Sequence, residues 1–195
     1  MKNVLALFDG ISCGQVALNR AGISFDTYYS SEIDKKCQEV TTVNYPNTVH
    51  LGDVTNWQSW DIEDLDLVMG GSPCQGFSFA GKQLNFNDPR SKLFFTMVDI
   101  INHFKPKYFL LENVVMKQSY QDIISQKLGV QPVFINSSDI TPQSRRRLYW
   151  TNIPGFTSGP KPKITKLSEI LQSDSQVDPK YLITPAHQKR IDNSE

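Results

Sequence analysis

A cysteine on a loop rich in glycine and proline is the residue of this chain best suited to covalent chemistry. Cys74 follows the apolar run Leu65 to Met69, within the stretch Gly70-Gly71-Ser72-Pro73-Cys74-Gln75-Gly76. A thiol placed directly after a buried strand contributes little to packing, and its thiolate is a good nucleophile. Because a lone cysteine is also a common small core residue, Cys74 by itself is only a candidate nucleophile.

A carboxyl group and an arginine cluster follow the next two candidate strands. Glu112 ends the apolar run Lys107 to Leu111, and Gln143-Ser144-Arg145-Arg146-Arg147 precedes a strand that resumes at Leu148. Neighbouring parallel strands end at one edge of a sheet, so the thiol and the carboxyl are expected to converge in one crevice. Guanidinium groups beside such a crevice suit phosphates or carbonyl oxygens, although consecutive arginines are also common as a solvated charged patch.

Three other strand ends carry groups that suit an adenosine-containing ligand. The stretch Phe8-Asp9-Gly10-Ile11-Ser12-Cys13-Gly14 places glycines between a strand and a helix, where backbone can approach a ligand. Glu32 could accept hydrogen bonds from ribose hydroxyls, and Asp53 could accept one from an adenine amino group. The glycine spacing is not GxGxxG, which favours a smaller adenosine ligand over a dinucleotide. The alternative is a tight turn with two solvated strand-end acids.

Apolar runs typical of buried strands alternate with helical patterns along the chain. They predict strands at residues 4–8, 27–31, 49–51, 65–69 and 107–111, a first helix that ends at Ala21-Gly22, a polar helix over about 34–45, and an amphipathic crossover helix over 93–104. This alternation predicts an α/β fold with a doubly wound, mostly parallel sheet.

The length of 195 residues favours one domain. The strand and helix pattern loosens near Pro154 into glycine, proline, serine and lysine, with short apolar pieces at residues 167–171 and 181–183. The sequence therefore predicts a compact core over residues 1–155 and a linking tail over residues 156–195.

Composition excludes several classes of protein. Acidic and basic residues balance at 20 each, so overall charge does not indicate a nucleic-acid partner and local patches must carry that argument. No apolar run approaches the roughly 18 residues of a membrane span, and the run Val4 to Phe8 is too short for a signal peptide. Three cysteines outside any CxxC spacing make neither a disulfide framework nor a zinc site. A cytoplasmic location is expected.

The order of these motifs resembles a known family. PCQ at 73–75, ENV at 112–114 and QxRxR at 143–147, after FxGxxxG at 8–14 and a strand-end acid, resemble the successive motifs of the DNA cytosine-5 methyltransferases. The resemblance covers about residues 3–155, and FDGIS with ENVV is especially similar to the animal de novo branch and its bacterial and phage relatives. The tRNA-methylating branch shares the fold and the cysteine loop, so RNA is an alternative substrate.

The resemblance implies a Rossmann-like class I methyltransferase that uses S-adenosyl-L-methionine and releases S-adenosyl-L-homocysteine. Cys74 would add to C6 of a cytosine flipped out of double-stranded DNA, and Glu112 would stabilise charge at N3. Arg147 would contact the cytosine O2, Arg145 would support the cysteine loop, and residues 76–90 could close over the base. No metal is needed. The residues implied at the cofactor are Phe8, Asp9, Gly10, Ser12, Cys13, Gly14, Glu32, Ile33, Asp53, Val54, Gly71, Pro73 and Leu93.

The resemblance stops before two parts that the family normally has, a target-recognition region and a closing segment that completes the cofactor pocket. The chain is therefore expected to be a fragment, to be completed by a second polypeptide, or to have lost full activity, and to methylate DNA feebly or not at all by itself. Two hypotheses stand, an active or once-completed methyltransferase in a bacterial or phage-infected cell, and a non-catalytic DNA-binding or regulatory relative. Intact Cys74, Glu112 and Arg147 favour the first hypothesis.

Overall fold

The computed structural model describes residues 1–73, 89–163, 165–173 and 176–178. The chain divides into two compact units, one of Met1–Asn136 with Arg145–Pro160 and one of Ser137–Ser144 with Lys161–Glu195. The described part of the second unit holds two short 3-10 helices, η3 (Ser137–Asp139) and η4 (Leu167–Glu169). Among the described residues, no helix combines the length and apolar character needed to cross a membrane.

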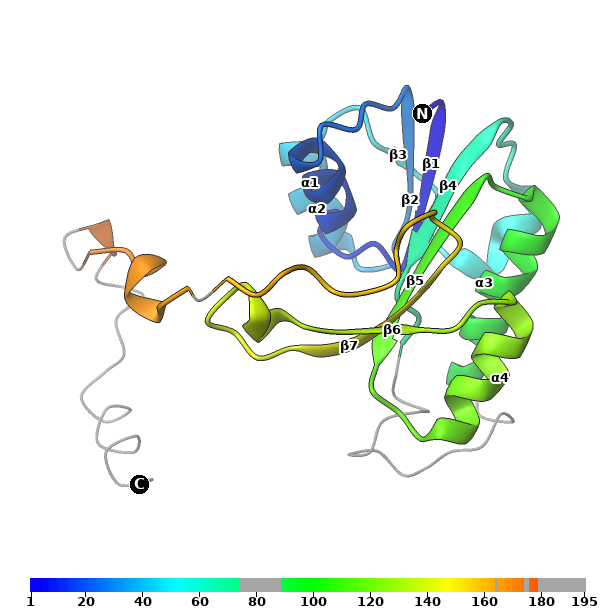
Figure 1. The fold of residues 1–195 in the computed structure, drawn as a ribbon. Helices are drawn as coiled ribbons and strands as arrows, with labels where there is room; N and C mark the ends of the chain where they lie inside the picture. The colour runs from blue at the N-terminus through cyan, green and yellow to red at the C-terminus, as the bar shows by residue number, and fades with distance from the viewer. Residues whose placement is uncertain (74–88, 164, 174–175, 179–195) are drawn as a thin grey trace. The chain divides into compact units, whose positions relative to one another are not determined.

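The first unit is built on a seven-stranded sheet in the order β3-β2-β1-β4-β5-β7-β6 (Figure 1). Neighbouring strands from β3 to β5 are parallel, and β7 runs antiparallel to β5 and β6. The strands are β1 (Asn3–Leu7), β2 (Thr27–Ser31), β3 (Val49–His50), β4 (Leu65–Gly70), β5 (Tyr108–Val114), β6 (Val133–Asn136) and β7 (Arg146–Thr151). The predicted doubly wound, mostly parallel sheet is confirmed.

Helices cover both faces of this sheet, with α1 and α2 on one face and α3 and α4 on the other (Figure 1). Successive strand residues point to opposite faces, so β1 contributes to both cores. Leu5 and Leu7 join the larger core with Phe94 of α3, whereas Val4 joins the smaller core with Leu18 of α1. The helices are α1 (Cys13–Arg20), α2 (Lys35–Asn44), the 3-10 helix η1 (Val54–Ser59), α3 (Pro89–Phe104) and α4 (Gln118–Leu128).

The structure adds to the sequence-based expectations and changes some of their boundaries. Strand β5 continues past Glu112 to Val114, because β7 pairs antiparallel with residues 112–114 and supplies their hydrogen-bond partners. Helix α4 and strand β6 were not predicted. The predicted closing loop lies outside the described residues up to residue 88, and its last two residues, Pro89 and Arg90, belong to α3. The apolar piece at residues 181–183 also lies outside the described residues.

Candidate functional site

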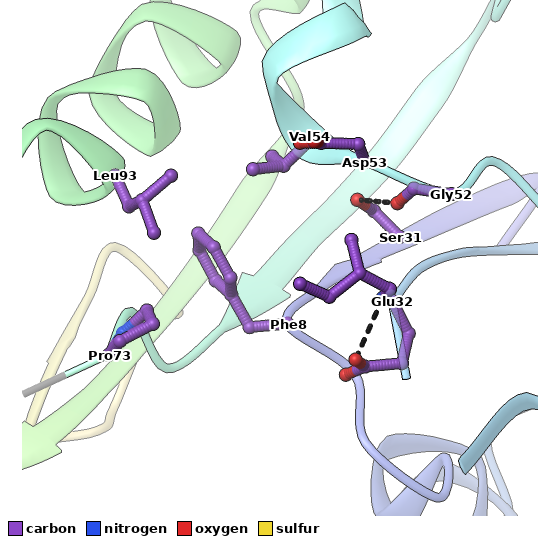
Figure 2. A pocket seen from close by; sticks show the side chains of 9 residues that line it. Phe8, Ser31, Glu32, Gly52, Asp53, Val54, Pro73 and Leu93 are labelled. Carbon is purple, nitrogen blue, oxygen red and sulfur yellow. Dashed lines mark hydrogen bonds between the residues drawn. The ribbon is translucent and has the colours of Figure 1, made fainter. Parts of the chain in front are cut away.

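A cavity of about 230 Å³ lies beyond the carboxyl ends of β1 and β2 (Figure 2). Most of its lining residues are among those that the sequence assigns to the cofactor. Figure 2 shows the Phe8 ring at the centre, with Leu93 and Pro73 on one side and Glu32 on the other. The lining residues are Phe8, Ser31, Glu32, Ile33, Gly52, Asp53, Val54, Pro73 and Leu93. The cavity is thus mostly apolar with two carboxylates, as small-ligand sites commonly are.

The Glu32 carboxylate ties the turn after β1 to the end of β2. Its Oε2 accepts a hydrogen bond from the Gly10 backbone N–H at 2.8 Å. Its Oε1 accepts from the N–H groups of Ile33 and Asp34, each at 2.8 Å. A carboxylate offers about four acceptor positions, so these three donors leave room for one more hydrogen bond. Glu32 is therefore oriented by the backbone before any ligand is present.

Asp53 caps the 3-10 helix η1 and lines the same cavity. Its Oδ1 accepts from both the backbone N–H and the hydroxyl of Thr55, each at 2.8 Å. Within the described part of the chain, its Oδ2 bonds no donor. An N-cap holds a side chain in one orientation, so this second oxygen is a fixed acceptor.

The turn after β1 is held by a polar network behind the cavity. Both oxygens of Asp9 are engaged, one by the Tyr28 hydroxyl at 2.9 Å and the other by the Ser12 hydroxyl. Ser12 is fully buried and also accepts from the Thr41 hydroxyl at 3.2 Å. Burial and the adjacent Asp9 carboxylate raise the pKa of Tyr28 above its usual value. The network stabilises a turn in which Phe8 and Ser12 have positive φ, a conformation that is costly for these residue types.

A second cavity, of about 660 Å³, runs along the sheet face beside α1. Gly14 lines it, and a Cβ at this position would lie 2.5 Å from the Tyr28 hydroxyl oxygen and 2.6 Å from the Met69 sulfur. A side chain at position 14 would therefore force the Tyr28 or Met69 side chain to shift. Four residues predicted at the cofactor, Asp9, Cys13, Gly14 and Gly71, line this second cavity instead of the first, and Glu112 and Tyr149 line it with them.

Glu112 and the arginine cluster meet across the β5–β7 pair. The Arg147 Nε lies 2.6 Å from Glu112 Oε1, and Arg145 Nη2 lies 3.7 Å from the same oxygen. The side chains of Arg147 and Glu112 are 19% and 30% exposed, so this ion pair is shielded more than a surface pair. Arg146 lies elsewhere, with its guanidinium carbon 5.5 Å from the centre of the Phe134 ring.

The start of the cysteine loop runs against the same carboxylate. A Cβ at Gly71 would lie 2.7 Å from Glu112 Oε2, so only glycine fits without displacing Glu112. Cys74 lies outside the described residues, two positions beyond Ser72. Burial, and secondarily the charge of Glu112, raise the pKa of Tyr149, which is paired with Glu112 across the two strands.

Sequence reasoning did not single out Ser31 and Gly52 of the first cavity, or Tyr149 of the second. Ser31 donates its hydroxyl to the Gly52 carbonyl at 2.9 Å, and Gly52 has a positive φ of 72° that favours glycine (Figure 2). Each precedes a predicted acid, Glu32 or Asp53, so position at a strand end was the available signal. Tyr149 follows Arg147 by two residues and so points to the same face of β7.

Comparisons with known proteins identify the family. Residues 2–177 match the family model described as C-5 cytosine-specific DNA methylase. The chain is 37% identical over 196 residues to the type II methyltransferase M.HaeII of Haemophilus aegyptius, covering 91% of this chain and 60% of the relative. It is 33% identical over 207 residues to the type II methyltransferase M.NgoBI of Neisseria gonorrhoeae, covering 98% and 64%.

Solved structures show the same fold. The crystal structure of Spodoptera frugiperda DNMT2 matches with a TM-score of 0.68 and 25% identity, over 94% of this chain and 63% of that one. The S. pombe Dnmt2 methyltransferase, at 18% identity, matches with a TM-score of 0.64 over 98% and 65%. The sheet therefore has the class I methyltransferase fold.

The chain thus spans only part of its curated relatives: 64% of the length of M.NgoBI, 60% of M.HaeII, and 42% of M.NgoBV of Neisseria gonorrhoeae. The comparisons give no support to a second polypeptide as a partner. The extent of the family match and the identity to these relatives place the chain, by sequence as well as by fold, in the C-5 cytosine-specific DNA methylase family.

Proposed function

We propose that this chain is the catalytic part of a DNA cytosine-5 methyltransferase that acts through a covalent adduct at Cys74. The observation that carries the proposal is the convergence of Gly71, at the start of the cysteine loop, with Glu112 and Arg147. A nucleophile-bearing loop, a carboxyl and a guanidinium at one sheet edge are the groups that addition to a cytosine ring requires. The family description, a C-5 cytosine-specific DNA methylase, supports DNA as the partner, and we propose double-stranded DNA as its form.

S-adenosyl-L-methionine is the proposed methyl donor, with its adenosine in the first cavity. The carboxylates of this cavity fit an adenosine group. Glu32 keeps an acceptor position for a ribose hydroxyl, and Asp53 Oδ2 is available to accept from an adenine amino group. Phe8, Val54 and Leu93 supply apolar walls for the flat base. When bound, the cofactor supplies an electrophilic methyl group.

The proposed chemistry begins with the Cys74 thiolate, which adds to C6 of the flipped cytosine and forms a carbon–sulfur bond. The electron pair of the C5–C6 double bond would move into the ring and make C5 a nucleophile. C5 would then accept the methyl group, whose bond to the donor sulfur breaks and leaves S-adenosyl-L-homocysteine. Glu112 would hold a proton at N3, and Arg147 would donate to O2, so that both stabilise the charge that develops on the ring. Loss of the C5 proton and β-elimination then restore the double bond and the free thiolate. Arg145 would support the loop.

A trapping experiment tests this proposal. DNA with 5-fluorocytosine blocks the loss of the C5 substituent, so incubation with S-adenosyl-L-methionine should leave a covalent protein–DNA adduct that survives denaturing electrophoresis. Cys74→Ser should abolish the adduct, and Cys37→Ser, on α2, serves as the matched cysteine control. An adduct that persists in Cys74→Ser, or none with the unaltered chain, would reject the proposal. A cytoplasmic location and the linking role of residues 156–195 stay predictions.

A further inference from the structure

Asn113 is a buried polar residue next to Glu112 that the proposed reaction does not use. Its side chain is 1% exposed and lies on β5, among the largest fully buried side chains of the described residues. A buried amide is costly unless its donors and acceptor are hydrogen-bonded. The partners of this amide therefore show what the residue holds in place.

The Asn113 amide bridges β5 and the segment that follows β4. Its Nδ2 donates to the Ser72 hydroxyl at 3.2 Å and lies 3.4 Å from the Ser72 carbonyl oxygen. Its Oδ1 accepts from the backbone N–H of Val114 at 2.8 Å, which fixes the amide against its own strand. Ser72 is itself only 4% exposed. The donor group of Asn113 is thus committed to one residue, and that residue lies two positions before Cys74.

Glu112 contacts the preceding residue of the same segment. Consecutive residues of a strand point to opposite faces of a sheet, so Glu112 and Asn113 reach the segment from different sides. A Cβ built at Gly71 would lie 2.7 Å from Glu112 Oε2, so the carboxylate leaves no room for a side chain at Gly71. Two successive residues of β5 therefore hold two successive residues of the segment leading to the cysteine.

We propose that Asn113 is a positioning residue that fixes the Gly71–Ser72 segment against Glu112, and with it the start of the loop that carries the nucleophile. This inference rests on the proposed function. Reacting groups held in a near-attack geometry gain most of their rate from that placement, and a misplacement of about 1 Å costs roughly a hundredfold. A side chain that touches neither cofactor nor base would thus control the rate of cysteine addition.

The experiment compares adduct formation on 5-fluorocytosine DNA by the full chain and four variants, at saturating DNA and S-adenosyl-L-methionine. Asn113→Ala removes the amide, and Asn113→Asp keeps the acceptor for Val114 while losing the donor to Ser72. Ser72→Ala removes one of the two acceptors and keeps the carbonyl. Ser125→Ala is the matched control, because Ser125 is buried and accepts from the Trp150 indole N–H at 3.0 Å within the core. Calorimetric affinity for S-adenosyl-L-homocysteine and the melting temperature are measured for each.

The expected result is a trapping rate that falls roughly ten- to a hundredfold in Asn113→Ala and in Asn113→Asp, and less in Ser72→Ala. The affinity for S-adenosyl-L-homocysteine should stay within about twofold, because the first cavity contacts neither Asn113 nor Ser72. Ser125→Ala should lose melting temperature without losing trapping rate. Asn113→Asp keeps the test decisive if Asn113→Ala does not fold.

Two different results would overturn the inference. If both Asn113 variants trap at the rate of the unaltered chain, Asn113 has a structural role alone. The same follows if Ser125→Ala loses as much trapping rate as the Asn113 variants for an equal loss of melting temperature. If the unaltered chain forms no adduct, the proposed function fails and the inference fails with it. The first result leaves the proposed function intact, so the two failures are distinguishable.

Discussion

Replacing Asp53 by asparagine tests the adenosine assignment with little disturbance of the fold. The Asp53 Oδ1 accepts two hydrogen bonds from Thr55, and this cap fixes the orientation of the side chain. In the Asp53→Asn variant, the amide oxygen must take the place of Oδ1 to keep those bonds. The amide nitrogen then stands where Oδ2 was, and an acceptor becomes a donor at an unchanged position.

The magnitude follows from these contacts. A hydrogen bond to a charged acceptor contributes about 1.5–3 kcal/mol, and the exposure of Asp53 in the ligand-free protein places its value at the lower end. A loss of about 1.5 kcal/mol corresponds to roughly tenfold weaker binding of S-adenosyl-L-homocysteine. Asparagine and aspartate are about equally good N-cap residues, so the free energy of unfolding should change by less than about 0.5 kcal/mol. Asp53→Ala should lose the cap as well, at a cost of about 1 kcal/mol in stability.

The assay is isothermal titration calorimetry with two ligands. S-adenosyl-L-homocysteine presents an amino donor at the purine C6 position, and its deaminated analogue S-inosyl-L-homocysteine presents a carbonyl acceptor there. The unaltered chain should prefer the amino ligand, and Asp53→Asn should lose or reverse that preference. Equal binding of S-adenosyl-L-homocysteine by Asp53→Asn and the unaltered chain, with the melting temperature unchanged, would refute the placement of adenine at Asp53.

Three other predictions concern the cavities and the ion pair. Glu32→Gln should weaken binding of S-adenosyl-L-homocysteine about tenfold in the same titration, because an amide nitrogen would face the Gly10 backbone N–H from which Glu32 now accepts. Undiminished binding would contradict the ribose role. Gly14→Ala should lower the free energy of unfolding by about 1–3 kcal/mol in urea, since the new Cβ would lie 2.5 Å from the Tyr28 hydroxyl oxygen. An unchanged unfolding midpoint would count against this close contact between Gly14 and Tyr28. Arg147→Met should cost about 1–2 kcal/mol, because the partly buried Glu112 carboxylate would keep only its longer contact to Arg145. Glu112→Gln in the same chain should recover part of this loss, and strictly additive effects would show that the pair is not coupled.

The strand ends were predictable because local patterns encode them. Apolar runs bounded by glycine or acidic residues identified β1, β2, β4 and most of β5, and α/β topology then placed Phe8, Glu32 and Asp53 at one edge. These residues do line one cavity. Strand β6 and helix α4 were missed, because β6 has only four residues and α4 carries a mixed polar sequence in which the helical period is weak.

The sequence by itself determined the order of the motifs and the residue types that could do chemistry, since these are written in consecutive residues. Tertiary structure decided the side-chain contacts that strand-end positions do not determine. The Asp9 and Ser12 side chains are joined behind the turn, and Gly14 lies against the Tyr28 and Met69 side chains. The pairing of Arg147 with Glu112 depends on an antiparallel strand that returns after 35 residues, and no local pattern encodes that register. Register is set by the burial of whole strand faces and by backbone hydrogen bonding between distant segments, so it appears only when the chain has folded.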